Sequence, residues 1–258
     1  MYLRDHVVIL RSDPFREHDR RIVMFGESHG LLEAVARGVD RKESKQAGHL
    51  LPMMEAEVMI AKGAAFDKLA VARATRSYRT LRTRLGSLAI AGSFLDLFER
   101  LQRPGIVDAG SYALLTDLLD IADRLPEEPS IERAKLLFAT AAMKLLDRTG
   151  FAPQLTRCGL CYDGFREEDV RQLPQDGTIV HEDCYRSVRT AQPNAMLIPH
   201  TVRTVARFLR DESLEKALLI TGTSQSFAAV SSMVYRFIRQ TPLTHEPHGM
   251  STIAVMLG

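Results

Sequence analysis

All three cysteines of the 258-residue chain lie between residues 158 and 184. They form the pattern Cys158-x2-Cys161, then nineteen residues, then His181-x2-Cys184. Pairs of ligands with x2 spacing are typical of zinc sites, because two short turns can bring four thiolate or imidazole groups to one tetrahedral metal. The spacing predicts one structural zinc ion per chain, held by Cys158, Cys161, His181 and Cys184.

Two other interpretations of these residues remain. The cysteines are also compatible with small buried residues beside an ordinary surface histidine, or with a redox Cys-x2-Cys pair. A redox pair is less favoured, because such motifs lie at a strand-to-helix junction and this one enters a turn-rich stretch. A zinc deaminase needs His-x-Glu ahead of Pro-Cys-x2-Cys, whereas the order here is reversed. Four protein ligands would also leave no open position for a catalytic water.

Basic residues gather in two parts of the chain, although the formal net charge is only +2. The stretch 68–95 contains six basic residues and no acidic one, and a second basic group occupies 37–45. Long, flexible cations suit phosphate contacts, which need charge rather than base-specific geometry. A solvated surface is the alternative for either group alone. The expected DNA-binding residues are Arg37, Arg41, Lys42, Lys45, Arg76 and Arg79.

Common catalytic motifs are absent from the sequence. It contains no Gly-x4-Gly-Lys-Ser/Thr loop, no His-Glu-x2-His and no Gly-x-Ser-x-Gly. We therefore expect no catalytic residue and no enzyme activity. The chain also has no run of the roughly 18 to 20 apolar residues that a membrane span needs, and no signal-peptide pattern at its start. A cytoplasmic protein without a membrane partner is expected.

The first 75 or so residues contain five short apolar runs separated or ended by glycines, and these runs predict five strands. They cover residues 6–10, 21–25, 31–36, 50–60 and 68–74. In the fourth run, apolar Met54, Ala56, Val58 and Ile60 alternate with the residues between them, which is the period of a strand with one buried face. Five strands without long helices favour a small closed barrel, most simply an OB-fold over 1–76.

Beyond about residue 75 the apolar spacing changes to three, four or seven, which predicts helices. A long helix is expected over 81–101, a second from an N-cap at Ser111 to Leu125, and a third from Ser130 to Gly150. Helical spacing returns after about 196. The expected class is therefore α+β: an N-terminal five-stranded OB-fold barrel, and then an all-helical domain over 77–258 with a zinc-binding module inserted at 151–190.

Several ordered motifs resemble those of the RecO family of bacterial recombination mediators. They are Val8-Ile9-Leu10-Arg11 with Asp19-Arg20, Phe25-x4-Gly30-Leu31-Leu32-x2-Val35-Ala36-Arg37-Gly38, Arg41-Lys42-x2-Lys45 leading to Gly48-x3-Pro52, and Leu145-Leu146-x3-Gly150-Phe151-Ala152-Pro153 followed by Arg157-Cys158-x2-Cys161. The likeness is strongest over 8–52 and 145–161, and it is weak after about 190.

The resemblance implies a non-enzymatic DNA repair protein with an OB domain, a helical domain and a zinc module. It implies binding to single- and double-stranded DNA, annealing of complementary strands, recognition of the acidic tail of single-stranded DNA-binding protein, and work with RecR to load RecA at the nucleoid. Zinc-bearing members typically use four cysteines, whereas His181 takes the third ligand position here. Apolar helix grooves over 114–138 are expected to hold the partner's tail. The alternative function is a zinc-ribbon adaptor that binds proteins and anneals nothing.

Overall fold

The computed structural model describes residues 1–126 and 131–241, and the chain divides into two compact units, 1–128 and 129–258. The first unit contains a closed five-stranded barrel and three helices, and the second contains further helices and a small sheet. These observations confirm the expected α+β class, with an OB-like barrel ahead of the helices. Within the described residues, no helix is both long and apolar enough to cross a membrane.

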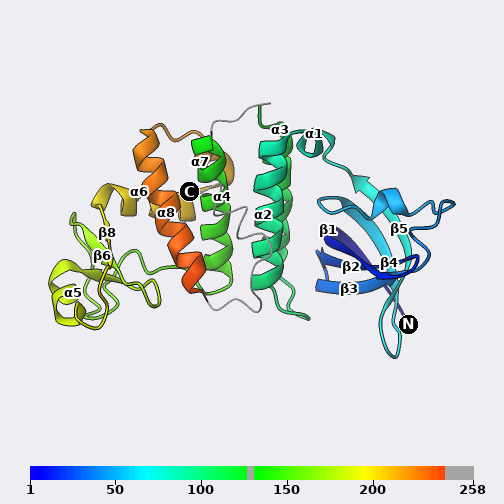
Figure 1. Cartoon of the computed structure of the whole chain (residues 1–258), viewed down its shortest axis with the longest axis horizontal. Helices are drawn as coiled ribbons and strands as arrows, with labels where there is room; N and C mark the ends of the chain where they lie inside the picture. Colours follow the sequence, from blue (N-terminus) through cyan, green and yellow to red (C-terminus); the bar gives the residue numbers. More distant parts are fainter. Residues whose placement is uncertain (127–130, 242–258) are drawn as a thin grey trace. The chain divides into compact units, whose positions relative to one another are not determined.

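The barrel closes in the strand order β1-β2-β3-β5-β4 (Figure 1). Its strands are β1 (Tyr2–Arg16), β2 (Asp19–Gly26), β3 (Gly30–Ala36), β4 (Glu55–Ala61) and β5 (Lys68–Arg76). Neighbours pair antiparallel except β3 and β5, whose parallel contact at Val35 and Lys68 completes the ring. This closure removes the exposed sheet edges that an open sheet would leave.

Alternating burial along β4 confirms the predicted period of two. Met54, Ala56, Val58 and Ile60 are buried in the barrel, whereas Glu57 between them is exposed. The buried side chains belong to one apolar cluster to which every strand contributes. Each large aliphatic side chain in such a cluster contributes about 1.5–3 kcal/mol through burial. The barrel is therefore held by its own apolar core.

Two strands differ from the prediction by more than two residues. The first strand was expected over 6–10 but runs from Tyr2 to Arg16, because its first half pairs with β4 and its second half pairs with β2. The fourth was expected from Leu50 but begins at Glu55, because residues 47–49 form a 3-10 turn, η1 (Ala47–His49). Met53, with φ +63°, then turns the chain into the strand.

The expected single helix over 81–101 is wrong, because the chain breaks at Arg84. Two helices, α1 (Arg79–Thr83) and α2 (Leu85–Leu101), flank this residue, which is extended at φ −113° and ψ 116°. The Arg84 guanidinium donates to the carbonyl of Leu125. Leu85, expected on the apolar stripe, is 83% exposed. Apolar spacing alone did not reveal the break.

Helix α3 (Ala109–Arg124) begins earlier than the predicted cap at Ser111. Asp108 is the N-cap, and its carboxylate accepts from the amide of Gly110 at 3.0 Å. Ser111 lies inside the first turn and donates to the same carboxylate at 2.6 Å. Asp and Ser are both favoured cap residues, so the position of the cap depends on the chain that enters the helix.

The second unit places the metal-ligand segment between helices. Helix α4 (Ile131–Arg148) packs against α6 (His200–Asp211), α7 (Leu214–Leu218) and α8 (Ser224–Gln240) (Figure 1). The predicted cap Ser130 lies outside the described residues. A small antiparallel sheet in the order β7-β6-β8 follows α4, and helix α5 (Glu182–Val188) continues directly from β7. Its strands are β6 (Val170–Gln172), β7 (Ile179–His181) and β8 (Met196–Ile198).

Candidate metal centre and nucleic-acid interface

The four predicted metal ligands come together from two turns of the chain. Cys158 and Cys161 lie on a tight turn in which the amide of Cys158 donates to Asp163 and that of Tyr162 donates to Cys158. His181 ends β7, and Cys184 lies in the first turn of α5. The two x2 pairs are thus presented by a turn and by a strand-to-helix junction.

The ligand atoms of these four residues all lie within 4.8 Å of one another. The Nδ1 atom of His181 is 3.3 Å from the Cys161 sulfur and 4.0 Å from the Cys184 sulfur. Thiolates at the usual zinc–sulfur length of about 2.3 Å would be roughly 3.8 Å apart in a tetrahedron. The cluster therefore has the donor set and the spacing to hold a metal ion.

Hydrogen bonds and burial act differently on two of the thiols. Burial works to raise the pKa of Cys158, but backbone hydrogen bonds at Cys161, Leu160 and His181 lower it to about 6. Burial raises the pKa of Cys184 to about 12, and its contacts with Cys161 and Cys158 add to that effect. Thiolates that crowd together in this way are stabilised by a shared cation.

Residues around the cluster orient its histidine. The Nε2 atom of His181 lies 3.4 Å from a carboxylate oxygen of Glu168, which leaves Nδ1 directed at the sulfurs. The ring of Phe165 meets the histidine edge-on, with centroids 4.9 Å apart. A carboxylate on the outer nitrogen of a ligating histidine is a common feature of zinc sites, because it fixes the tautomer and the ring orientation.

Gly159, between the two cysteines of the turn, allows close approach to the small sheet. Its amide donates to the carbonyl of Ile179 at 2.9 Å. A Cβ at this position would lie only 2.2 Å from the Cγ2 atom of Thr178. The small residue between the cysteines is therefore part of the site's construction.

The predicted basic residues of the barrel loop lie together on its surface. Arg37, Arg41, Lys42 and Lys45 are all exposed in the segment that follows β3. None of the four forms an ion pair with any acidic side chain within residues 1–126 and 131–241, although Arg37 lies over the ring of Phe66 at 6.0 Å. Their charges are free to meet phosphates.

The two other predicted DNA-binding residues differ from each other. Arg76 is held by Asp120, to which its Nη1 donates at 2.8 Å, and it lies over the ring of Tyr78 at 4.9 Å. Arg79 is exposed on α1. Arg82 donates to the carbonyls of Ser77 and Pro52. Like Arg84, it uses its guanidinium for hydrogen bonds within the protein. The six cations of 68–95 do not form one free basic surface.

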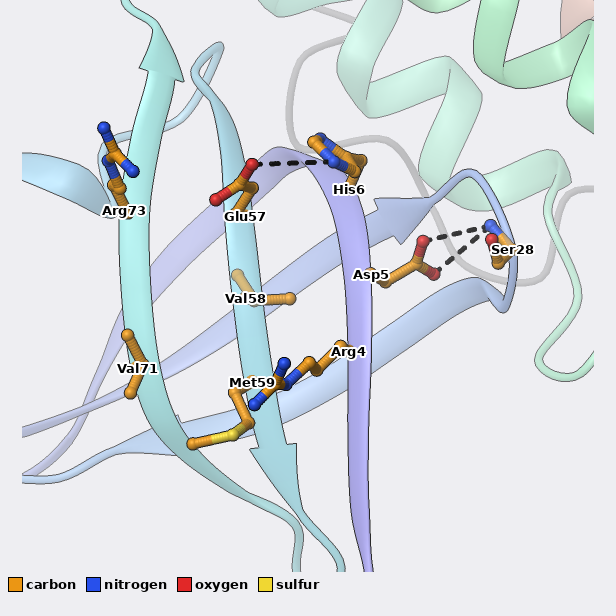
Figure 2. A pocket seen from close by; sticks show the side chains of 9 residues that line it. All are labelled: Arg4, Asp5, His6, Ser28, Glu57, Val58, Met59, Val71 and Arg73. Atoms are coloured by element: carbon orange, nitrogen blue, oxygen red, sulfur yellow. Dashed lines mark hydrogen bonds and ion pairs between the residues drawn. The ribbon is translucent and has the colours of Figure 1, made fainter.

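Sequence reasoning missed a groove of about 500 Å³ on the outer face of β1, β4 and β5 (Figure 2). Arg4 lies beside apolar Met59 in this view, Arg73 lies higher on β5 near Glu57, and His6 is 3.7 Å from Glu57. Arg4 faces Met59 across β1 and β4, and Arg73 faces Glu57 across β4 and β5. Strand alternation was the signal that places such outward residues on one face.

Among the described residues of 114–138, the apolar side chains that predicted a groove for the partner's tail are buried. Leu114, Leu118, Leu137 and Phe138 are all at most 7% exposed. The exposed fractions of these four side chains argue against an exposed apolar groove at these positions. Helical spacing marks an apolar face of a helix without showing whether other helices cover it.

These features define a class of protein: an OB-like barrel followed by helices and a small module whose Cys3His cluster could hold a metal ion. The description "Recombination protein O N terminal" matches residues 1–78, and "Recombination protein O C terminal" matches residues 82–242. The chain belongs to the recombination protein O family.

Curated relatives match a smaller part of the chain. A DNA repair protein RecO from Bifidobacterium longum is 39% identical over 75 residues, which cover 29% of this chain and 31% of the relative. Proteins of the same name from Desulforudis audaxviator and Rubrobacter xylanophilus are 30% and 29% identical over 103 and 98 residues. These cover 40% and 38% of this chain, and 41% and 40% of the relatives. The chain thus spans about a third to two fifths of the relatives' length in these matches.

Proposed function

We propose that this protein is a DNA repair mediator that binds single- and double-stranded DNA without sequence preference and anneals complementary strands. The observation that carries the proposal is the exposed group Arg41, Lys42 and Lys45, without acidic partners among the described residues, on the loop of an OB-like barrel. OB barrels commonly bind single strands along a charged groove. Family membership supports the same assignment.

The mediator acts without catalysis. Because the chain has no nucleotide-binding loop, binding free energy must remodel the strands. In this proposal it works at the nucleoid with RecR, recognises the acidic tail of single-stranded DNA-binding protein, and helps to load RecA. The metal of the Cys3His cluster is zinc, since three thiolates and one imidazole in a closed site suit that ion. Zinc there has a structural role.

Annealing of complementary oligonucleotides tests the proposal. We expect acceleration without ATP, also when the strands are coated by single-stranded DNA-binding protein. A partner protein lacking its acidic tail should reduce the acceleration on coated strands. Equal rates with and without the tail would remove tail recognition. No acceleration on any strand would favour the adaptor function, in which the zinc module binds proteins only.

A charge-removal variant tests the loop. Arg41→Ala, Lys42→Ala and Lys45→Ala together should weaken binding by a similar factor on unrelated sequences, and each lost contact should lower the salt slope by about 0.7 to 0.9. Lys62→Ala is the control, since Lys62 is already paired with Asp67 at 2.6 Å. A triple variant that binds like the parent would exclude the loop from the DNA interface.

A further inference from the structure

A basic pocket of about 470 Å³ lies in the second unit, beside the Cys3His cluster. Its lining comes from the module and from α6, and consists of Phe165, Arg166, Glu167, His200, Arg203, Thr204 and Arg207. Three arginines and a histidine therefore share the pocket with one carboxylate. None of these positively charged residues is a candidate metal ligand or part of the barrel loop.

Arg203 forms a fixed part of the pocket wall, because the residue is buried at only 3% exposure. Its guanidinium donates to the carbonyls of Leu155, Arg166 and Glu168. Its Nε is buried and has no hydrogen-bond partner within the described residues, and no described carboxylate forms an ion pair with it. A buried charge whose hydrogen bonds all go to neutral carbonyls has a high desolvation cost, and a nearby anion lowers that cost.

Arg207, one helical turn further along α6, lies close enough to affect Arg203. Burial lowers the pKa of Arg203, Glu168 partly opposes this, and the charge of Arg207 lowers it further. Arg207 is exposed, as is Arg166 across the pocket. Two cations repel each other, and an anion placed between them stabilises both.

We propose that this pocket binds a phosphate group of the DNA backbone, through Arg166, Arg207 and the hydroxyl of Thr204, with the charge of Arg203 behind them. The inference rests on the proposed DNA-binding function and adds a second contact site to it. An acidic peptide with an apolar side chain fits less well. The one apolar lining residue, Phe165, is already covered by Arg203 at 4.8 Å and by His181.

The pocket is joined to the metal cluster by two direct contacts. Phe165 lies between His181 and Arg203. Glu168 accepts from Arg203 through its carbonyl and lies 3.4 Å from His181 through its carboxylate. Loss of the metal should therefore misplace Arg203 and Phe165. We expect phosphate affinity to fall in metal-depleted protein although no pocket residue is changed.

Inorganic phosphate is the first probe. Titration into the full-length, metal-loaded protein, followed by the Nε–Hε NMR signals of its arginines, should shift the signals of Arg203 and Arg207. The shift of the Arg203 signal should be absent in Arg207→Ala and retained in Arg186→Ala. Arg186 is a suitable control because it is exposed on the same module and paired with Asp183 at 3.1 Å. No shift in the parent protein would overturn the pocket.

A thymidine oligonucleotide is the second probe. The variant Arg166→Ala/Arg207→Ala should lower the salt slope of binding by about 1.4, or about 0.7 for each contact on single strands. An unchanged slope, with the barrel-loop triple variant still impaired, would overturn the pocket and leave the proposed function standing. If the parent binds no oligonucleotide, the proposed function fails. Phosphate shifts seen in that case would contradict the assignment of the pocket to DNA.

Discussion

The barrel and the metal module both carry charged surface residues, but the apolar cores beneath these residues differ greatly in size. The barrel cluster contains fourteen buried apolar residues, whereas the module cluster contains five, including Cys158 itself. At about 1.5–3 kcal/mol for each large side chain, the module's own cluster is by far the smaller source of burial free energy. We therefore expect folding of the module to depend on a bound metal more than folding of the barrel does.

In the barrel, the residues expected to bind DNA are different from those that stabilise the fold. In the module, residues expected to bind the metal also stabilise the fold. The barrel's cations lie on a loop, and its core lies on strands, so a loop change should affect binding alone. In the module, Cys158 is both a candidate metal ligand and a core residue at 1% exposure. A ligand change there should affect the fold first and any bound anion through it.

Metal removal should have the largest effect, and it should be confined to the module. A structural zinc contributes about 10–16 kcal/mol to the folding of zinc-finger peptides. Chelation, or Cys161→Ser, should therefore abolish hydrogen-exchange protection over 155–190 and expose that segment to protease. Protection of β1 to β5 should stay as in the parent.

Asp183→Ala is the control, because Asp183 is exposed in α5 and lies between the predicted ligands His181 and Cys184 without being one of them. Metal analysis of reduced protein purified without chelator should find about one zinc per chain. A folded, protease-resistant module without metal would contradict the comparison, since its five-residue core would then be sufficient.

A cavity in the barrel core should have the opposite effect: it should destabilise the barrel and leave the metal module unchanged. Ile60 is 1% exposed within the barrel cluster, and Ile60→Ala should lower the free energy of unfolding of the barrel by about 2–5 kcal/mol. Hydrogen exchange of β4 should report the loss, with metal content unchanged. Glu57→Ala on the same strand points outward and should change the stability by less than about 0.5 kcal/mol. Loss of metal from Ile60→Ala would show that the units are not independent.

A smaller effect is expected next to the metal cluster. Glu168→Gln keeps the size of the side chain and removes the charge beside His181 Nε2. Changes to such partners typically lower metal affinity about 10- to 100-fold. Competition with a coloured chelator should measure the loss. Glu167→Gln is a matched control from the next position, since Glu167 has no described contact with the histidine. Equal metal affinities for the two variants would show that Glu168 does not support metal binding.

The sequence predicted best where a pattern had a single physical cause. Alternation in Met54 to Ile60 requires one buried face, and β4 has it. The x2 spacing of the cysteines also predicted a cluster that the structure brings within 4.8 Å. In both cases the residues that carry the signal are close in sequence or are few of their kind.

Prediction was poorer where distant residues decide the outcome. At the break, Arg84 donates to the carbonyl of Leu125, and Arg76 pairs with Asp120. Arg4 and Arg73 share a groove because two strands flank β4. No local count of charge or apolar spacing contains these partners.

The smallest expected effect distinguishes two of the predicted DNA-binding arginines. Arg76 is paired with Asp120, whereas Arg41 has no acidic partner among the described residues. Because the carboxylate already offsets much of the charge at Arg76, its release to a phosphate would leave Asp120 unpaired. Exposed pairs of this kind are worth only about 0–1 kcal/mol, so the difference should be modest.

Arg76→Ala should accordingly lower the salt slope of DNA binding by less than Arg41→Ala, for which the loss is about 0.7 to 0.9. Asp120→Asn supplies the matched test, since it frees Arg76 without removing it and should tighten binding in the parent but not in Arg76→Ala. Titration of one oligonucleotide at several salt concentrations measures all three variants. If Arg76→Ala and Arg41→Ala lower the slope equally, Arg76 leaves Asp120 when DNA binds. The basic surface would then extend from the loop to the end of β5.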